Sequence, residues 1–201
     1  MQQVIAIHGG TTFADYNDYL TFLASKPLIA NRFTHQPMWK DLLQDNLGDE
    51  YQVLLPKMPN ATNAKYSEWA IWFRHFTELI EDDCILIGHS LGAVFLAKYL
   101  SENEFARRIK ATILVAAPFE DESDEDLTDF KLTEVSELFI KQAGQVTLYF
   151  GYDDPVIVPT EIKKYSQYLP DAKFNVVSAP DHFVRADFPE MITTIKELTI
   201  L

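Results

Sequence analysis

The sequence predicts a three-layer α/β fold: a doubly wound parallel sheet of six strands with helices on both faces. Short apolar runs rich in β-branched residues alternate with longer segments whose apolar residues recur at helical spacing. The 201 residues are 47 % hydrophobic, which is enough for one domain with a sizeable core. We find no internal repeat and no linker-like segment, so residues 1–201 are expected to form a single domain.

The expected strands are apolar runs of four to six residues, the length typical of buried parallel strands. They are Val4–Ile7, Tyr51–Leu55, Cys84–Ile87, Ala111–Ala116, Val146–Phe150 and Lys173–Val177. In such a sheet, ligands bind beyond the carboxyl ends of the strands. The loops that follow these strands are therefore expected to share one edge.

The expected helices separate the strands and are Pro37–Leu47, Tyr66–Ile80, Ala93–Leu100, Leu132–Ala143, Thr160–Tyr168 and Asp187–Leu198. Proline at the start and Gly48 just past the end delimit the first of them. The second carries an aromatic stripe at helical spacing, which is typical of core packing rather than of a substrate platform. The stripe consists of Trp69, Trp72, Phe73 and Phe76.

Charge and cysteine content exclude several classes of partner. A net charge of −13 would repel a nucleic-acid backbone or an anionic membrane. A single cysteine rules out an internal disulfide and fits a reducing compartment. The apolar start is too short for a signal peptide and lacks basic residues, and no run is long enough to span a membrane. We therefore expect a cytoplasmic protein.

The stretch Cys84–Leu100 carries the strongest chemical signal. An apolar strand leads into Gly88-His89-Ser90-Leu91-Gly92, and a helix follows. This is the pattern of a nucleophile elbow, in which glycines let strand and helix pack closely around a serine in a strained conformation. The serine hydroxyl then projects from the sheet at a helix N-terminus, where a developing negative charge is favoured.

A serine needs a base to take its proton, and the base needs an acid to fix its tautomer. In elbows of this kind the acid and the base follow the serine along the chain. Of the five histidines, His182 alone lies well downstream of Ser90, in a turn after the last strand. His89 belongs to the elbow, and its side chain is expected to support neighbouring loops.

The acid is expected after the fifth strand, in Gly151-Tyr152-Asp153-Asp154-Pro155. Asp154 is favoured because the following proline restricts the backbone and leaves Asp153 as the turn former. Glu120 and Asp121 remain as alternative acids. The acidic run that they begin lacks the glycine and distal glutamate of a calcium loop, so no metal is expected there. Cys84 begins a buried strand and is expected to pack in the core.

The first strand ends in His8-Gly9-Gly10-Thr11. A glycine pair at this place brings backbone N–H groups close to whatever lies above the sheet, which suits an oxyanion hole. An ordinary tight turn is the alternative.

The elbow, the acid segment and Asp181-His182-Phe183 together resemble the α/β-hydrolase superfamily. Short length, Met58-Pro59-Asn60 and the Asp-Asp-Pro segment are similar to the small serine hydrolases related to retinoblastoma-binding protein 9. The resemblance covers the first strand and most of the chain from Trp39 onward.

The resemblance implies the sheet order 2-1-3-4-5-6. It implies Ser90 as nucleophile, Asp154 as acid and His182 as base. It also implies an oxyanion hole formed by the backbone N–H of Leu91 and one from Gly10 or Thr11. The family's first loop is usually Pro-Gly-x-Gly-Gly, and because this chain departs from it, the second donor stays open between these two.

These residues predict a metal-free and cofactor-free serine hydrolase that cleaves small carboxylic esters, or thioesters, through an acyl-enzyme. The same triad serves peptidases and amidases, which the sequence does not separate from esterases. The other alternative is a protein-interaction module that keeps the hydrolase fold.

Phe13–Asn31 is an additional helical segment that departs from the site edge of the sheet. Apolar side chains form one stripe along it, namely Tyr16, Tyr19, Leu20 and Leu23. The stripe needs an apolar surface to cover. The segment is expected to be a small cap that limits acyl chain length, or else a helix packed on the flank of the sheet as added core.

Overall fold

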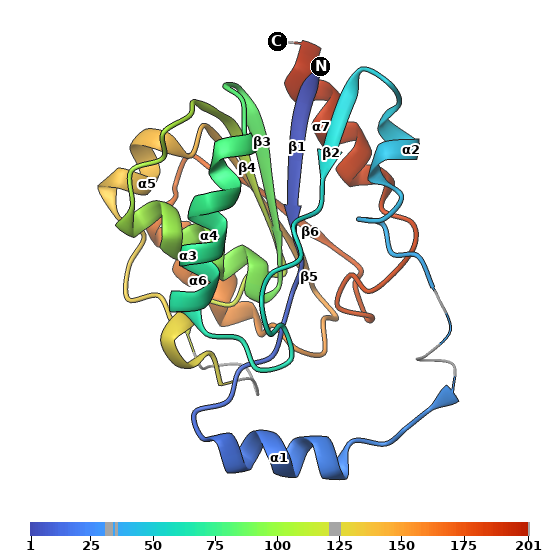
Figure 1. Ribbon diagram of the computed structural model, residues 1–201. Coiled ribbons are helices and arrows are strands. Elements are labelled where there is room, and N and C mark those ends of the chain that lie inside the picture. Colours follow the sequence, from blue (N-terminus) through green and yellow to red (C-terminus); the bar gives the residue numbers. More distant parts are fainter. Residues whose placement is uncertain (31–33, 35, 121–125, 201) are drawn as a thin grey trace.

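Six parallel strands form one sheet in the order β2-β1-β3-β4-β5-β6 in the computed structural model, which describes residues 1–30, 34, 36–120 and 126–200 (Figure 1). The strands are β1 (Gln2–Ile7), β2 (Tyr51–Leu54), β3 (Cys84–His89), β4 (Ile109–Val115), β5 (Gln145–Gly151) and β6 (Lys173–Val177). Fold class and strand order are therefore confirmed, and each strand lies within two residues of its expected bounds.

Helices cover both faces of this sheet. The covering helices are α2 (Leu43–Leu47), α3 (Tyr66–Phe76), α4 (Leu91–Glu102), α5 (Glu137–Gln142), α6 (Pro159–Tyr168) and α7 (Pro189–Ile200). The described chain also has α1 (Tyr16–Ser25) and the 3-10 turns η2 (Thr77–Leu79) and η3 (Thr128–Phe130). Figure 1 shows α2 and α7 on one side of the sheet and α3 to α6 on the other. None of the helices in the described part of the chain has the length and apolar character needed to cross a bilayer.

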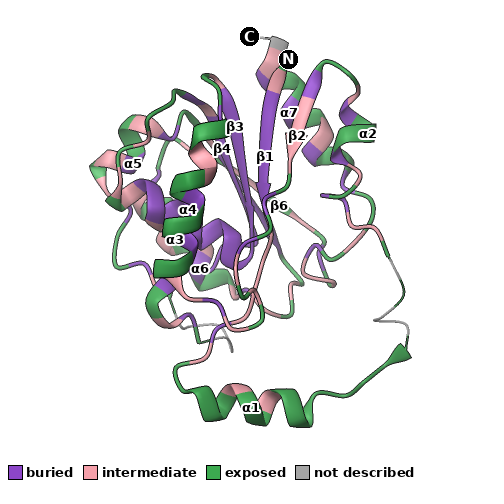
Figure 2. Cartoon of the chain, viewed as in Figure 1, coloured by how far each residue is buried: buried purple, intermediate pink, exposed green. Residues whose placement is uncertain are grey.

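The central strands form the core. All six residues of β3 and five of the six in β1 are buried, which is why these segments read as continuous apolar runs (Figure 2). Trp69 and Phe73 of the aromatic stripe on α3 are fully buried and pack edge-to-face against Phe95 of α4. Trp72 on the same helix is about half exposed, so the stripe is a core face with one member outside it.

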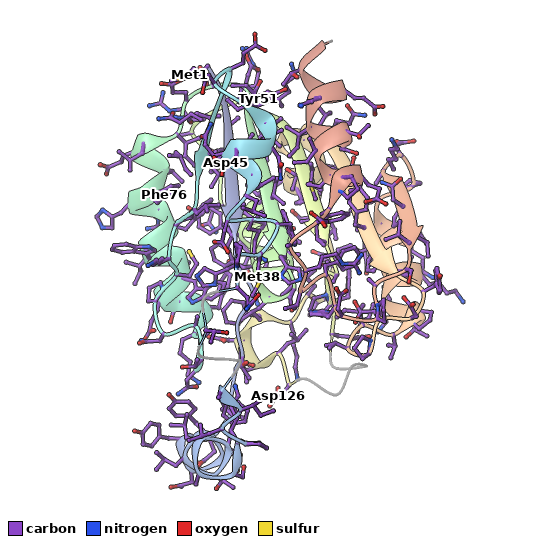
Figure 3. All side chains as sticks on the ribbon, turned by 90° about the vertical axis from the view of Figure 1, so that its right-hand side faces the viewer. Met1, Met38, Asp45, Tyr51, Phe76 and Asp126 are labelled. Atoms are coloured by element: carbon purple, nitrogen blue, oxygen red, sulfur yellow. The ribbon has the colours of Figure 1, made fainter. Side chains whose placement is uncertain are left out.

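The helix α1 stands apart from the rest of the molecule, beyond the carboxyl edge of the sheet (Figure 1). Asp15 caps its start by accepting a hydrogen bond from the Asn17 N–H at 2.6 Å, and none of its residues is buried. The expectation of added core on the flank of the sheet is therefore wrong. Figure 3, turned by 90°, shows the same separation, with Asp126 between α1 and the sheet. Asn31, the end of the predicted segment, lies outside the described residues.

The predicted helix Pro37–Leu47 forms only over its last five residues, as α2. Before it the chain makes a turn, in which the Asp41 carboxylate accepts from the Met38 N–H and the Asp41 N–H donates to the Met38 carbonyl, both at 2.8 Å. The turn outcompetes the helix because an aspartate side chain can satisfy backbone donors locally. As a consequence, Trp39 and Lys40 leave the helical direction: Trp39 reaches the loop after β6, and Lys40 reaches His89 at the end of β3.

Candidate active site

Ser90 occupies the sharp turn between β3 and α4. Its backbone has φ 55° and ψ −123°, a conformation that costs a residue with a side chain about 1–3 kcal/mol. A Cβ on Gly92 would lie only 2.5 Å from the carbonyl oxygen of His8, so the close packing of α4 against the end of β1 requires a glycine there. The Ser90 N–H donates to the Val115 carbonyl at 2.9 Å and ties the turn to β4. Strand, turn and helix match the motif in the sequence.

Ser90, His182 and Asp154 meet at the carboxyl edge of the sheet. The Ser90 Oγ lies 3.0 Å from Nε2 of His182, and Nδ1 of that ring lies 3.0 and 2.9 Å from the two carboxylate oxygens of Asp154. The Asp154 side chain is 0 % exposed and that of His182 13 %. Because a carboxylate only accepts, the imidazole holds its proton on Nδ1, and Nε2 faces the serine hydroxyl as an acceptor. The structure thus brings these three predicted residues into one hydrogen-bonded chain.

Backbone donors hold the Asp154 carboxylate in place. Its Oδ1 accepts from the N–H groups of Val156 and Ile157 at 2.8 and 3.1 Å, in the loop that follows the carboxylate. These charge-assisted bonds orient the side chain before any substrate binds. Glu120, one of the alternative acids, pairs with a lysine of α6 instead, and Asp121 lies outside the described residues.

Asp153 has a different task. Its carboxylate accepts from the Ser178 hydroxyl at 2.8 Å and from the Ala179 N–H at 2.5 Å, and so joins the loop after β5 to the loop after β6. Although desolvation disfavours its charge, these two hydrogen bonds hold the pKa of Asp153 below its usual value. The His182 loop is thereby anchored at its start.

The backbone N–H groups of Leu91 and Gly10 lie on the same edge, and within the described chain neither has a hydrogen-bond partner. The Thr11 N–H is already donated to the Ala61 carbonyl at 2.8 Å. Of the two alternatives that the sequence left open for the second donor, the Thr11 N–H is therefore occupied, whereas the Gly10 N–H has no partner among the described residues.

His8 is a residue of this site that the sequence did not identify. Its Nε2 accepts from the Met58 N–H at 2.9 Å, so its Nδ1 carries the proton and donates to the Gly9 carbonyl at 2.7 Å. That carbonyl belongs to the same peptide group as the Gly10 N–H. A trans peptide is planar, so holding the oxygen also fixes the direction of the N–H. The sequence did offer one signal for this role, because His8 stands directly before the glycine pair.

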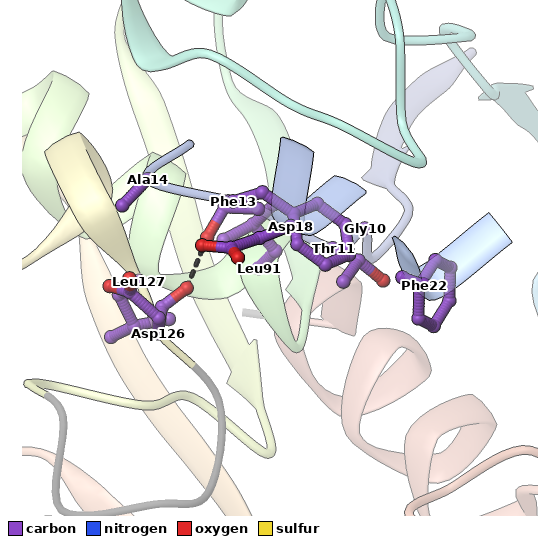
Figure 4. A pocket seen from close by; sticks show the side chains of 10 residues that line it. Gly10, Thr11, Phe13, Ala14, Asp18, Phe22, Leu91, Asp126 and Leu127 are labelled. Carbon is purple, nitrogen blue, oxygen red and sulfur yellow. Dashed lines mark hydrogen bonds between the residues drawn. The ribbon is translucent and has the colours of Figure 1, made fainter. Parts of the chain in front are cut away.

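A pocket of about 280 Å³ opens beside the two backbone donors (Figure 4). Gly10 and Leu91 form its inner side, Phe13 and Phe22 come from the α1 segment, and Leu127 lines it from the loop after β4. The Thr12 hydroxyl donates to the Asp126 carbonyl and links the two outer walls. An apolar chain attached to an acyl group on Ser90 has this space next to it.

Among the described residues, neither the cysteine nor any cluster of metal-ligating side chains forms a second reactive site. Burial raises the pKa of the Cys84 thiol to about 12, and the side chain packs in the core at the start of β3. No group of three or more histidine, cysteine or acidic side chains in the described segments is arranged to hold a metal ion.

Comparison with known proteins places this site in a family. The family model for serine hydrolases matches residues 32–191. The serine hydrolase RBBP9 of Rattus norvegicus is 28 % identical over 152 residues, which span 74 % of this chain and 78 % of that protein. Among solved structures, the ydeN gene product of Bacillus subtilis covers all of both chains with a TM-score of 0.73 at 18 % identity. A thioesterase domain from the curacin biosynthetic pathway gives 0.57 at 12 %, over all of this chain and 91 % of that one. These two likenesses concern the fold.

Proposed function

This chain belongs to the serine hydrolase family, and from that membership we propose that it cleaves carboxylic esters through an acyl-enzyme on Ser90. The observation that carries the proposal is the unbroken hydrogen-bonded chain from the Ser90 hydroxyl through His182 to the buried Asp154. Each member lies at the distance that proton transfer needs, before any substrate is bound.

In the first half of the reaction, His182 Nε2 takes the proton of the Ser90 hydroxyl while Oγ attacks the ester carbonyl carbon. The carbonyl oxygen becomes an oxyanion and accepts hydrogen bonds from the N–H groups of Leu91 and Gly10. Collapse of this intermediate breaks the bond to the alcohol oxygen, and His182 returns the proton to the leaving alcohol. Asp154 stabilises the imidazolium without itself becoming protonated.

In the second half, His182 takes a proton from water, which attacks the acyl-enzyme carbonyl. The same two N–H groups meet the second oxyanion, and the proton returns to Ser90 as the carboxylic acid leaves. Three features accelerate the reaction: a positioned base, a fixed imidazole tautomer and preorganised backbone N–H donors.

The substrate side of the site favours a small, uncharged acyl group. A pocket of about 280 Å³ lies just below the range typical of small-molecule sites. Two acidic residues, Asp18 and Asp126, are among those that line it, and the whole chain carries a net charge of −13. Both oppose anionic acyl donors such as acyl-CoA. We propose that the α1 segment acts as a small cap over this pocket and limits acyl chain length.

A fluorophosphonate probe tests the proposal directly, because it labels a serine only when that serine is activated. We expect wild type to be labelled and Ser90→Ala to remain unlabelled while keeping its fold. A folded wild type that takes no label would overturn the enzyme assignment and favour the interaction module. A panel of p-nitrophenyl esters, matched thioesters and aminoacyl amides then identifies the bond, and ester preference is the expected result.

A further inference from the structure

Lys40 is a buried lysine whose amine contacts a histidine next to the site. Its side chain leaves the turn before α2, and the residue is 8 % exposed. Nζ lies 3.0 Å from Nδ1 of His89 and 4.7 Å from the centre of the Trp39 ring. An ammonium in such a position must find an acceptor, because an isolated charge in the interior is expensive. Here the acceptor is the histidine that directly precedes Ser90.

The other side of the His89 ring determines which nitrogen carries the proton. Nε2 lies 2.9 Å from the backbone carbonyl oxygen of His182. A carbonyl only accepts, so Nε2 carries the hydrogen and donates, and Nδ1 has the lone pair. Lys40 donates to that lone pair. The two bonds form a directed chain from the Lys40 ammonium through the His89 ring to the His182 carbonyl.

The carbonyl held in this way belongs to a strained stretch of backbone. His182 and Phe183 both have positive φ, 55° and 56°, a conformation that residues with side chains adopt only when their surroundings impose it. The two successive carbonyls each accept from a buried ring: that of His182 from His89, and that of Phe183 from the Trp39 indole N–H at 3.1 Å. The imidazole that faces Ser90 is thus fixed through its backbone as well as through Asp154.

We propose that Lys40 and His89 are positioning residues that hold the His182 backbone, and with it the imidazole, against Ser90. Lys40 acts by keeping His89 neutral and in the tautomer that donates from Nε2. The proposal rests on the proposed role of His182 as the base, and it adds two residues that never touch the substrate.

The charges around His89 agree with this role. Burial, followed by the charge of Lys40, lowers the pKa of His89 well below its usual value, so the ring stays neutral and Nδ1 remains an acceptor. Among the other groups, Asp41 raises the pKa of Lys40, while His8 adds to the lowering for His89. Protonated His89 would have no lone pair for Lys40, and the other tautomer would turn a lone pair toward the His182 carbonyl.

A double-mutant cycle tests the pair. Lys40→Met keeps an unbranched side chain, one atom shorter, and removes the donor, while His89→Gln keeps an N–H donor that depends on no tautomer. We expect Lys40→Met to lower kcat on the best ester by about tenfold with KM unchanged, and to slow fluorophosphonate labelling equally. In the His89→Gln background the same change should have almost no effect. Lys196→Met, at an exposed lysine of α7 that donates to the Asn46 carbonyl, is the control for loss of one positive charge.

If Lys40→Met costs the same factor in both backgrounds, Lys40 does not act through His89 and the proposal is overturned. A second measurement does not depend on activity: ring ¹H–¹⁵N correlations in protein labelled on histidine. We expect His89 in wild type to show a protonated Nε2 and a bare Nδ1, and the His182 ring signals to shift in Lys40→Met but not in Lys196→Met. Protonated Nδ1 on His89, or unmoved His182 signals, would also overturn it. If wild type takes no fluorophosphonate label but shows these ring signals, the proposed function is wrong, while the hydrogen-bonded chain from Lys40 through His89 to His182 stands.

Discussion

Asp153 and Asp154 are neighbours in the chain, yet their carboxylates serve different loops. That of Asp154 lies 2.9 Å from Nδ1 of His182, whereas that of Asp153 accepts from the Ser178 hydroxyl and the Ala179 N–H. One therefore orients the imidazole through its ring, and the other anchors the loop that carries it.

This division predicts different results for the same substitution. Asp154→Asn should lower kcat by about 10⁴-fold, because the amide favours the wrong imidazole tautomer. Asp153→Asn retains an acceptor oxygen for the Ala179 N–H and should cost less than about tenfold. Steady-state kinetics on one ester, with thermal unfolding to verify the fold, compares the two. Reversed effects would exchange their roles and leave Ser90 and His182 in place.

The pocket beside α1 predicts a change in acyl chain preference. Phe22→Ala removes a ring from the pocket wall, so activity should move toward longer p-nitrophenyl esters. The melting temperature should hardly change, because no residue of α1 is buried. Tyr16→Ala on the same helix is the control, since Tyr16 is not part of the pocket wall. An unchanged profile for Phe22→Ala, or an equal shift in both variants, would show that α1 does not limit the acyl chain.

Lys40 predicts a specific dependence of stability on pH. Burial lowers its pKa from 10.5 to about 8, with Asp41 opposing, so between these values the unfolded chain binds a proton that the folded protein does not. Stability then rises as pH increases through this window, and the full penalty, about 3 kcal/mol, is present below pH 8.

Lys40→Met should therefore be more stable than wild type near neutral pH, and the advantage should narrow by about 2 kcal/mol near pH 10. Urea unfolding of both proteins at the two pH values measures this difference, in which all other titrating groups cancel. A gap that stays constant with pH would mean that folding does not lower the pKa of Lys40.

Two tryptophans on α3 make a matched test of the core. Trp69→Ala should lower the free energy of unfolding by about 3–5 kcal/mol, because a fully buried ring that donates to the Pro59 carbonyl is lost. Trp72→Ala, at a half-exposed site three residues along, should cost about 1 kcal/mol or less. Equal losses from chemical denaturation would contradict the placement of α3.

Much of the fold follows from local sequence. A parallel strand that is covered on both faces requires a continuous apolar run, and such runs made β1, β3 and β4 recognisable. The glycines around Ser90 marked the elbow, because no side chain fits between α4 and β1. The order of nucleophile, acid and base along the chain then left His182 as the candidate base. Helix ends were harder to place, and Pro37–Leu47 was overestimated because the Asp41 side chain stabilises a turn where apolar spacing alone predicts a helix.

The sequence by itself determined the sheet and predicted the serine elbow, the serine and the histidine, because these depend on periodicity and on backbone space. Only the tertiary structure showed that Asp154 and not Asp153 contacts the His182 ring, that the Thr11 N–H is already bonded, and that no residue of α1 is buried. It alone joined Lys40 to His89, 49 positions apart. These outcomes depend on which donor and acceptor meet across loops, and hydrogen bonds between distant segments leave no periodic trace in the chain.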